Sequence, residues 1–135
     1  MKVDRITAQA FRGYPERVDL ALGGDIVLIY GDNGAGKTSL TEAFEWALFG
    51  TVVRKSRSKT PGEYRGWDWV RSVHADPSTP TFAEVELVGR SGEHFIVRRE
   101  LQGRPTLTIN GAPVEDIRPL GLPTEDALSA VPRPV

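Results

Sequence analysis

A glycine-rich run carries the clearest chemistry in this sequence of 135 residues. Residues 31–38 read Gly-Asp-Asn-Gly-Ala-Gly-Lys-Thr and fit the pattern G-x-x-x-x-G-K-[ST], known as the Walker A loop. The glycines let the backbone curl so that several N–H groups converge on one phosphate chain. The run predicts a triphosphate site made of Gly31, Asp32, Asn33, Gly34, Ala35, Gly36, Lys37, Thr38 and Ser39.

Each polar side chain at the end of this loop has an expected role. We expect Lys37 to reach the β- and γ-phosphates as a mobile charge, and the Thr38 hydroxyl to bind Mg²⁺. Ser39 adds a further phosphate contact, and the helix that begins near Gly36 directs its N-terminal dipole at the same anion. The predicted ligand is therefore Mg·ATP. The alternative, a glycine-rich turn with an incidental lysine, disagrees with the elements on either side.

Those flanking elements are the ones that a phosphate-binding loop needs. The continuous apolar run 26–30 predicts a central strand that is covered on both faces. Apolar residues between positions 40 and 48 recur at helical spacing and predict a helix that ends at Gly50. Glu42 and Glu45 fall on the polar side of this helix, where we expect them to be exposed. Trp46 is expected to lie in the core or to be half-buried.

The remaining residues predict further strands and long connections. Alternating apolar residues mark strands at 2–10, 18–22, 83–87 and 95–101, and Asn110-Gly111 is a tight-turn signal. The predicted organisation is strands, loop and first helix over 1–50, a basic loop over 51–81, antiparallel strands over 82–117, and a proline-rich tail over 118–135. We expect at most one short helix in that tail, at 124–130.

Composition narrows the class of protein. The chain has 17 Lys and Arg against 18 Asp and Glu, with 39% hydrophobic residues, which is typical of a globular domain. The absence of cysteine excludes disulfides, thiol nucleophiles and cysteine-bound zinc. The apolar runs are too short to span a bilayer, and no signal peptide precedes them. We therefore expect a cytoplasmic protein without a membrane contact.

Residues 31–50, which end in Ala47-Leu48-Phe49-Gly50, resemble the Walker A loop and first helix of SMC-like ATPases. These are the ABC-type heads of the SMC, RecF, RecN and SbcC (Rad-fifty) proteins. Phe11-Arg12-Gly13 is similar to the family's Asn-Phe-Arg-Ser stretch, so the resemblance adds Arg12 to the nucleotide-binding residues. It implies an α/β fold, the amino-terminal lobe of a P-loop NTPase head with an antiparallel β meander.

The hydrolytic parts of that family do not occur in this sequence. The glutamine loop, the signature motif, the apolar Walker B strand that ends in Asp-Glu and a heptad-patterned coiled coil are all missing. The resemblance therefore implies a lobe that is inactive alone, within a full protein that hydrolyses ATP. The implied partners are the carboxyl-terminal half of the head, a second head joined by ATP, DNA and a nuclease. The implied task is break repair, chromosome handling or defence against foreign DNA.

A basic stretch at 54–71 holds six Lys or Arg and two Asp or Glu, a net charge of +4. One interpretation is a solvated loop, and the other is contact with DNA phosphates. Trp67 and Trp69 could stack on bases or pack the loop onto the domain. Phe11 and Tyr14 could likewise contact adenine or pack in the core. The DNA candidates are Arg54, Lys55, Arg57, Lys59 and Arg65.

Two other classes of protein carry the same loop. A small self-contained P-loop kinase or GTPase needs a basic lid or a guanine-reading Asn-Lys-x-Asp, and neither is evident. A non-hydrolysing module could use the loop as a switch for binding DNA or a partner. Nucleotide preference separates the first alternative from an ATPase head, and DNA binding with and without ATP tests the second.

Overall fold

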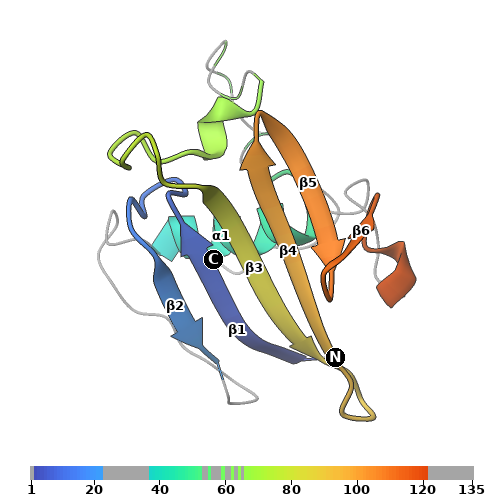
Figure 1. Ribbon diagram of the computed structural model, residues 1–135. Coiled ribbons are helices and arrows are strands. Elements are labelled where there is room, and N and C mark those ends of the chain that lie inside the picture. Colours follow the sequence, from blue (N-terminus) through green and yellow to red (C-terminus); the bar gives the residue numbers. More distant parts are fainter. Residues whose placement is uncertain are drawn as a thin grey trace.

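The computed structural model describes residues 2–22, 37–52 and 66–121, together with residues 55, 59, 62 and 64. In this part of the chain one α-helix lies behind a six-stranded sheet (Figure 1). The expected strand at 26–30, the loop residues 31–36 and the short helix expected at 124–130 lie outside the described residues.

The sheet has the order β2-β1-β3-β4-β5-β6, and every neighbouring pair is antiparallel. The strands predicted at 2–10, 18–22, 83–87 and 95–101 are confirmed, and Gly103, a glycine of positive φ, separates β4 from β5. Two short 3₁₀ turns lie outside the strands, one at Asp68–Val70 in the connection to β3 and one at Arg118–Leu120 after β6. The strands are β1 (Lys2–Gln9), β2 (Val18–Ala21), β3 (Thr81–Val88), β4 (His94–Gln102), β5 (Arg104–Ile109) and β6 (Ala112–Val114).

The tight turn predicted at Asn110-Gly111 is confirmed. Both residues have positive φ, 50° and 82°, which is the backbone conformation that a two-residue hairpin turn requires. The Asn110 side chain also accepts a hydrogen bond from the backbone N–H of Ile96, at 2.7 Å. The turn is therefore fixed to β4 as well as closing the β5–β6 hairpin.

Helix α1 (Lys37–Phe49) is joined to the sheet at its carboxyl end. Gly50, with φ of 74°, ends the helix as predicted, and its N–H donates to the Trp46 carbonyl at 2.8 Å. Arg99 of β4 donates to the last helical carbonyls, those of Ala47 at 3.3 Å and Leu48 at 3.5 Å. This contact fixes the end of α1, and hence the direction in which its beginning points.

The apolar face of α1 is buried as predicted, and Trp46 lies in the core with its ring 5.6 Å from that of Phe11. The prediction that Glu42 and Glu45 are exposed is wrong, because their exposed fractions are 1% and 5%. At Glu42, the side of the helix that the sequence pattern assigned to solvent is covered by Arg12, and the neighbouring Gly13 lies against Ser39. No helix in the described part of the chain is long and apolar enough to cross a membrane.

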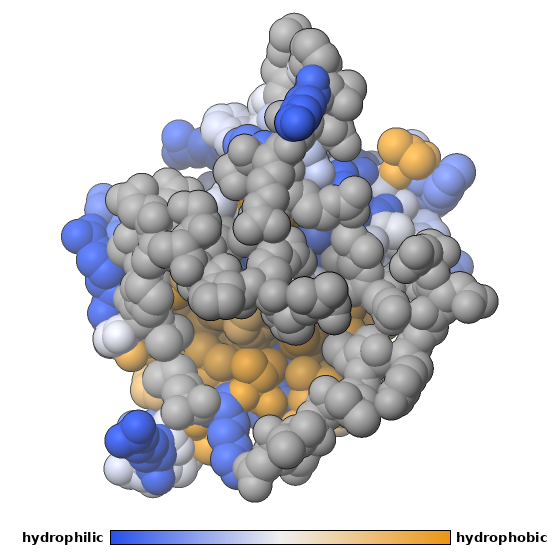
Figure 2. All heavy atoms as spheres, turned by 180° about the vertical axis from the view of Figure 1, so that it is seen from behind, coloured by the Kyte–Doolittle hydropathy of each residue, from blue (hydrophilic) through white to orange (hydrophobic). Residues whose placement is uncertain are grey.

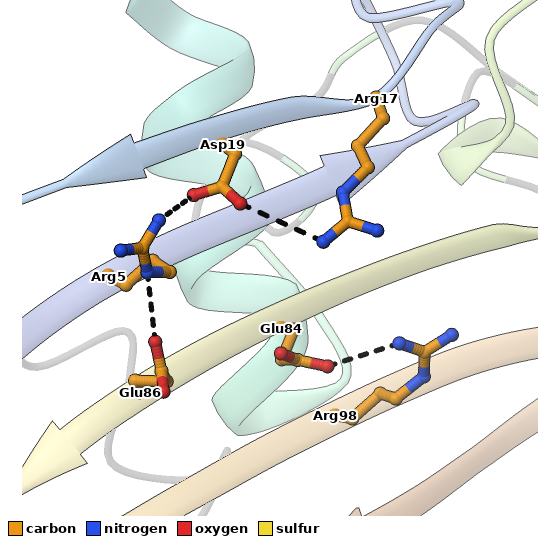
Figure 3. A network of polar contacts seen from close by, with 6 residues as sticks. All are labelled: Arg5, Arg17, Asp19, Glu84, Glu86 and Arg98. Carbon is orange, nitrogen blue, oxygen red and sulfur yellow. Dashed lines mark hydrogen bonds and ion pairs between the residues drawn. The ribbon is translucent and has the colours of Figure 1, made fainter.

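The two sides of the sheet differ in character. The side turned away from α1 carries ion pairs formed by Arg5, Arg17, Asp19, Glu84, Glu86 and Arg98 (Figure 3). The pairs Arg5–Asp19, Arg5–Glu86 and Arg98–Glu84 join neighbouring strands, whereas Arg17 pairs with Asp19 at the start of β2. We call this side the open face. From the opposite side, apolar side chains gather near the centre of the molecule (Figure 2). The helix side therefore holds the core, and the open face holds paired charges.

Candidate functional site

Helix α1 begins at Lys37, the lysine of the Walker A pattern, as a helix that follows a phosphate-binding loop should. Lys37 and Thr38 form the start of this helix, and Ser39 follows with a buried side chain. The candidate residues at 31–36 lie outside the described part of the chain. The described part of the candidate site therefore centres on Ser39 and Arg12.

Gly13 lies directly against the first turn of α1. Its backbone N–H donates to the Ser39 hydroxyl oxygen at 3.0 Å. A Cβ atom at position 13 would lie only 2.7 Å from that oxygen, so the close approach requires glycine or a shift of Ser39. Because a hydroxyl both accepts and donates, Ser39 keeps an O–H that can bind a phosphate oxygen.

The Arg12 side chain lies among four groups near this turn. Its Nε is 3.4 Å from the Glu42 carboxylate, and its Nη1 donates to the Trp69 carbonyl at 3.0 Å. Its guanidinium carbon is 5.6 Å from the centre of the Tyr64 ring and 5.7 Å from that of Trp69. These two rings meet edge to face, with centres 5.1 Å apart. The structure thus brings Arg12 and the start of α1 together.

The backbone at Arg12 is also fixed. Its φ of 46° lies in the left-handed region, which residues other than glycine adopt at an energetic cost. The Arg12 N–H donates to the Val70 carbonyl at 2.8 Å, and Phe11 forms bridges to Tyr14 and Arg71. Ala10, with φ of 49°, accepts hydrogen bonds from the Ser72 N–H and the Thr81 hydroxyl. Residues 10–14 therefore form a tight turn held by residues 69–72.

Arg71 supports this arrangement from inside the loop. Its guanidinium donates to the carbonyls of Thr79 at 2.7 Å and Asp76 at 2.6 Å, and to the Thr81 hydroxyl at 2.8 Å. Hydrogen bonds from the backbone and hydroxyl of Ser78 hold the pKa of the Asp76 carboxyl below its usual value. The charge of Arg71, which belongs to the basic stretch, is thus used to fold the loop onto the sheet.

The DNA candidates are described only in part. Lys55 and Lys59 are exposed, and the Lys55 ammonium is 5.8 Å from the centre of the Trp69 ring. Arg54, Arg57 and Arg65 lie outside the described residues. Two of the five positions expected to contact phosphates therefore carry an exposed basic side chain, Lys55 and Lys59.

The aromatic candidates separate by burial. Trp69 packs against Tyr64 and Arg12, whereas Trp67 is 51% exposed. Phe11 is fully buried, so its ring packs in the core and does not reach a nucleotide base. Tyr14 is partly buried, and burial raises the pKa of its phenol. Trp67 is thus the one of these rings with a large exposed surface.

Sequence reasoning missed the surroundings of Arg12. Glu42 was assigned to a solvated helix face, and Tyr64 had no signal at all, because both contacts join segments far apart in the chain. Glu42 follows Ser39 by one helical turn, so it lies above the start of α1, and this spacing is the signal that could have been used. Within the described residues, no group of three His, Asp or Glu side chains could hold a metal ion.

Comparison with known proteins gives consistent matches over most of the chain. A model of the AAA domain family matches residues 5–118. The DNA replication and repair protein RecF of Chloroflexus aggregans is 34% identical over 115 residues, which cover 83% of this chain and 28% of that protein. The chromosome partition protein Smc of Methylococcus capsulatus is 25% identical over 124 residues, covering 82% of this chain and 10% of that protein.

The fold is likewise similar to a solved structure, the SMC head domain from Thermotoga maritima. The TM-score is 0.64 at 21% sequence identity, and the match covers 85% of this chain and 39% of that one. The chain thus spans less than a third of the RecF protein and less than half of the SMC head. Its helix and antiparallel sheet form part of an SMC head-like fold.

Proposed function

The chain belongs to the AAA domain family, and on that premise we propose that it is the ATP-binding amino-terminal part of a RecF- or SMC-like ATPase that acts on DNA. The observation that carries the proposal is the junction of two segments. The turn at Arg12 and Gly13 packs on the first turn of α1, the helix that follows the Walker A sequence. An arginine, a hydroxyl and a helix N-terminus together suit a polyphosphate.

The residues present fit Mg·ATP in the types of group they offer. The backbone at Gly31–Gly36 and the Lys37 ammonium would hold the phosphates, and Thr38 would bind Mg²⁺. Ser39 and Arg12 would add an O–H donor and a guanidinium at the same end of α1. Bound ATP would supply the phosphoanhydride bond that the whole protein cleaves.

Nucleotide binding is tested by titrating the chain with a fluorescent ATP analogue in the presence of Mg²⁺. We expect Lys37→Ala to weaken binding at least about tenfold, since it removes a direct charge on the β- and γ-phosphates. Lys59→Ala is the matched control, because Lys59 is an exposed lysine outside the motif. Equal binding by both variants would contradict the proposal, and a preference for GTP would favour the small-GTPase alternative.

Hydrolysis needs residues that this sequence does not contain. The signature motif and the strand ending in Asp-Glu are missing, so we expect the chain alone to show no steady-state ATP turnover. Turnover that disappears in Lys37→Ala would overturn this expectation. Addition of the remaining half of the head is expected to restore activity.

Action on DNA is the further part of the proposal. The relatives are named for DNA replication and repair and for chromosome partition, which favours those tasks over defence against foreign DNA. The DNA contacts would come from Arg54, Lys55, Arg57, Lys59 and Arg65. Head dimerisation through ATP, a nuclease partner and a cytoplasmic location complete the proposal.

The DNA contact is tested by measuring affinity across a salt series. Reversing Arg57 and Lys59 to Glu should weaken binding and flatten the dependence of affinity on salt, because fewer counterions are then released. Reversal of Arg90 and Arg104, which lie in the turn after β3 and in β5, provides a charge-matched control. An unchanged slope in the first variant would remove the DNA role from this segment. Binding that requires ATP would favour the switch alternative.

A further inference from the structure

The Arg12 guanidinium is held by residues that the Walker A pattern does not include. Glu42 contacts its Nε, the Trp69 carbonyl accepts from its Nη1, and the rings of Tyr64 and Trp69 lie within 6 Å of its centre. In the described part of the chain, the other N–H groups of this guanidinium have no hydrogen-bond partner. They are the donors left for a ligand.

We propose that Glu42, Tyr64 and Trp69 are positioning residues, which hold Arg12 in one orientation at the edge of the nucleotide site. This inference rests on the proposed function, in which Arg12 contacts the phosphates. A free arginine side chain loses much rotamer freedom when it binds a phosphate. An arginine that is already held loses less, so the same contact contributes more to affinity.

The burial of Glu42 supports a role through Arg12. Its side chain is 2% exposed, and a carboxylate removed from water needs a compensating cation and hydrogen bonds. Arg12 supplies a cation at 3.4 Å. The carboxylate in turn fixes the Nε side of the guanidinium, so that the two groups hold each other in place.

The backbone adds a second, independent argument. Arg12 adopts a left-handed φ of 46°, and its N–H donates to the Val70 carbonyl, next to the Trp69 carbonyl that accepts from its side chain. Successive carbonyls of one 3₁₀ turn therefore bind both the main chain and the side chain of Arg12. A strained conformation that is fixed from several directions is typical of residues that must be presented in one geometry.

The first test needs no nucleotide. The chain is labelled with 5-fluorotryptophan, and the ¹⁹F signal of Trp69 is assigned by its loss in Trp69→Phe. We expect Glu42→Gln to shift this signal, because the guanidinium over the ring is released. The matched control is Glu45→Gln, the same change at another buried carboxylate of α1, and it should leave the signal in place. An unmoved Trp69 signal in Glu42→Gln would overturn the proposal, whether or not the chain binds ATP.

The second test measures affinity for Mg·ATP in the same variants. We expect Glu42→Gln to weaken binding about fivefold, because Gln lacks the negative charge that pairs with the guanidinium, and Glu45→Gln to weaken it less than about twofold. In an Arg12→Ala background, Glu42→Gln should have no further effect, because its action passes through Arg12. An equal effect in both backgrounds would show a role unrelated to Arg12 and would contradict the proposal.

A third test uses the Trp69 ring and does not depend on Glu42. Trp69→Phe keeps a ring beneath the guanidinium and should bind ATP within about twofold of the parent chain, whereas Trp69→Leu should bind about fivefold more weakly. Equal binding by the two variants would exclude a role for the ring. If the parent chain itself binds no ATP while the ¹⁹F shift occurs, the proposed function fails and the positioning of Arg12 stands.

Discussion

Arginine is used in two different ways in two regions of this molecule. In the turn region, formed by residues 10–14 and 69–81, Arg12 and Arg71 donate to backbone carbonyls of the loop. On the open face, Arg5 and Arg98 pair with carboxylates of neighbouring strands, which are already joined by the sheet ladder (Figure 3). The arginines of the turn region fix the position of a loop, whereas those of the open face add ion pairs to strands that backbone hydrogen bonds already join.

This contrast indicates which charged side chains are needed to keep the turn region folded. A guanidinium that satisfies several carbonyls of an irregular segment has no substitute when it is removed, because those carbonyls lose their partners. An exposed ion pair is exchanged for contacts with water at little cost. The turn region should therefore be sensitive to substitution and the open face tolerant.

The largest effect is expected for Arg71→Ala, at about 3 kcal/mol of unfolding free energy. The substitution removes the donor to the Asp76 and Thr79 carbonyls and to the Thr81 hydroxyl. Urea denaturation followed by circular dichroism measures the loss. A cost no larger than that of Arg98→Ala would contradict the greater sensitivity expected of the turn region.

The next effect is expected for Thr81→Val, at about 1–2 kcal/mol. The buried Thr81 hydroxyl accepts from Arg71 and donates to the Ala10 carbonyl, so a methyl group in its place removes one hydrogen bond from each of these two partners. Thr106→Val is the matched control, because Thr106 is exposed and makes one long hydrogen bond, at 3.4 Å. Equal unfolding free energies for the two variants would contradict a special role for the turn region.

Gly13→Ala is expected to cost about 1 kcal/mol, because its methyl group would displace the Ser39 hydroxyl. The steric part of this cost depends on the Ser39 oxygen. In Gly13→Ala combined with Ser39→Ala, we therefore expect a smaller loss than the sum of the two single losses. A double-mutant cycle on thermal unfolding measures this coupling. Strict additivity would show that the contact at the start of α1 does not constrain residue 13.

The smallest effects are expected on the open face. Arg98→Ala should cost about 1 kcal/mol or less, from its pair with Glu84 and its contact with the Phe82 ring at 3.8 Å. Asp19→Asn, which removes an exposed partner of Arg5, should leave the denaturation midpoint unchanged within error. Repeating both measurements in 1 M NaCl should reduce the first effect. A large loss in either variant would show that the open face stabilises the fold.

The sequence predicted the elements whose signals are local. The helix was recognisable from apolar spacing and from Gly50, and the β5–β6 turn from Asn110-Gly111, because each depends on neighbouring residues alone. The prediction for Glu42 and Glu45 failed for the opposite reason. Whether a polar helix face meets water depends on which segment packs there, and at Glu42 that segment is the turn at Arg12 and Gly13, which precedes the helix in the sequence by more than 20 residues.

The candidate site likewise has parts that local sequence signals predict and parts that depend on contacts between distant segments. Residue types at fixed spacing were enough to recognise the Walker A pattern, the helix that begins near Gly36 and the resemblance to SMC-like heads. Only the tertiary structure decided that Arg12 meets Glu42, Tyr64 and Trp69. Such contacts arise when a sheet brings distant segments over one helix, and no short-range pattern in the chain specifies them.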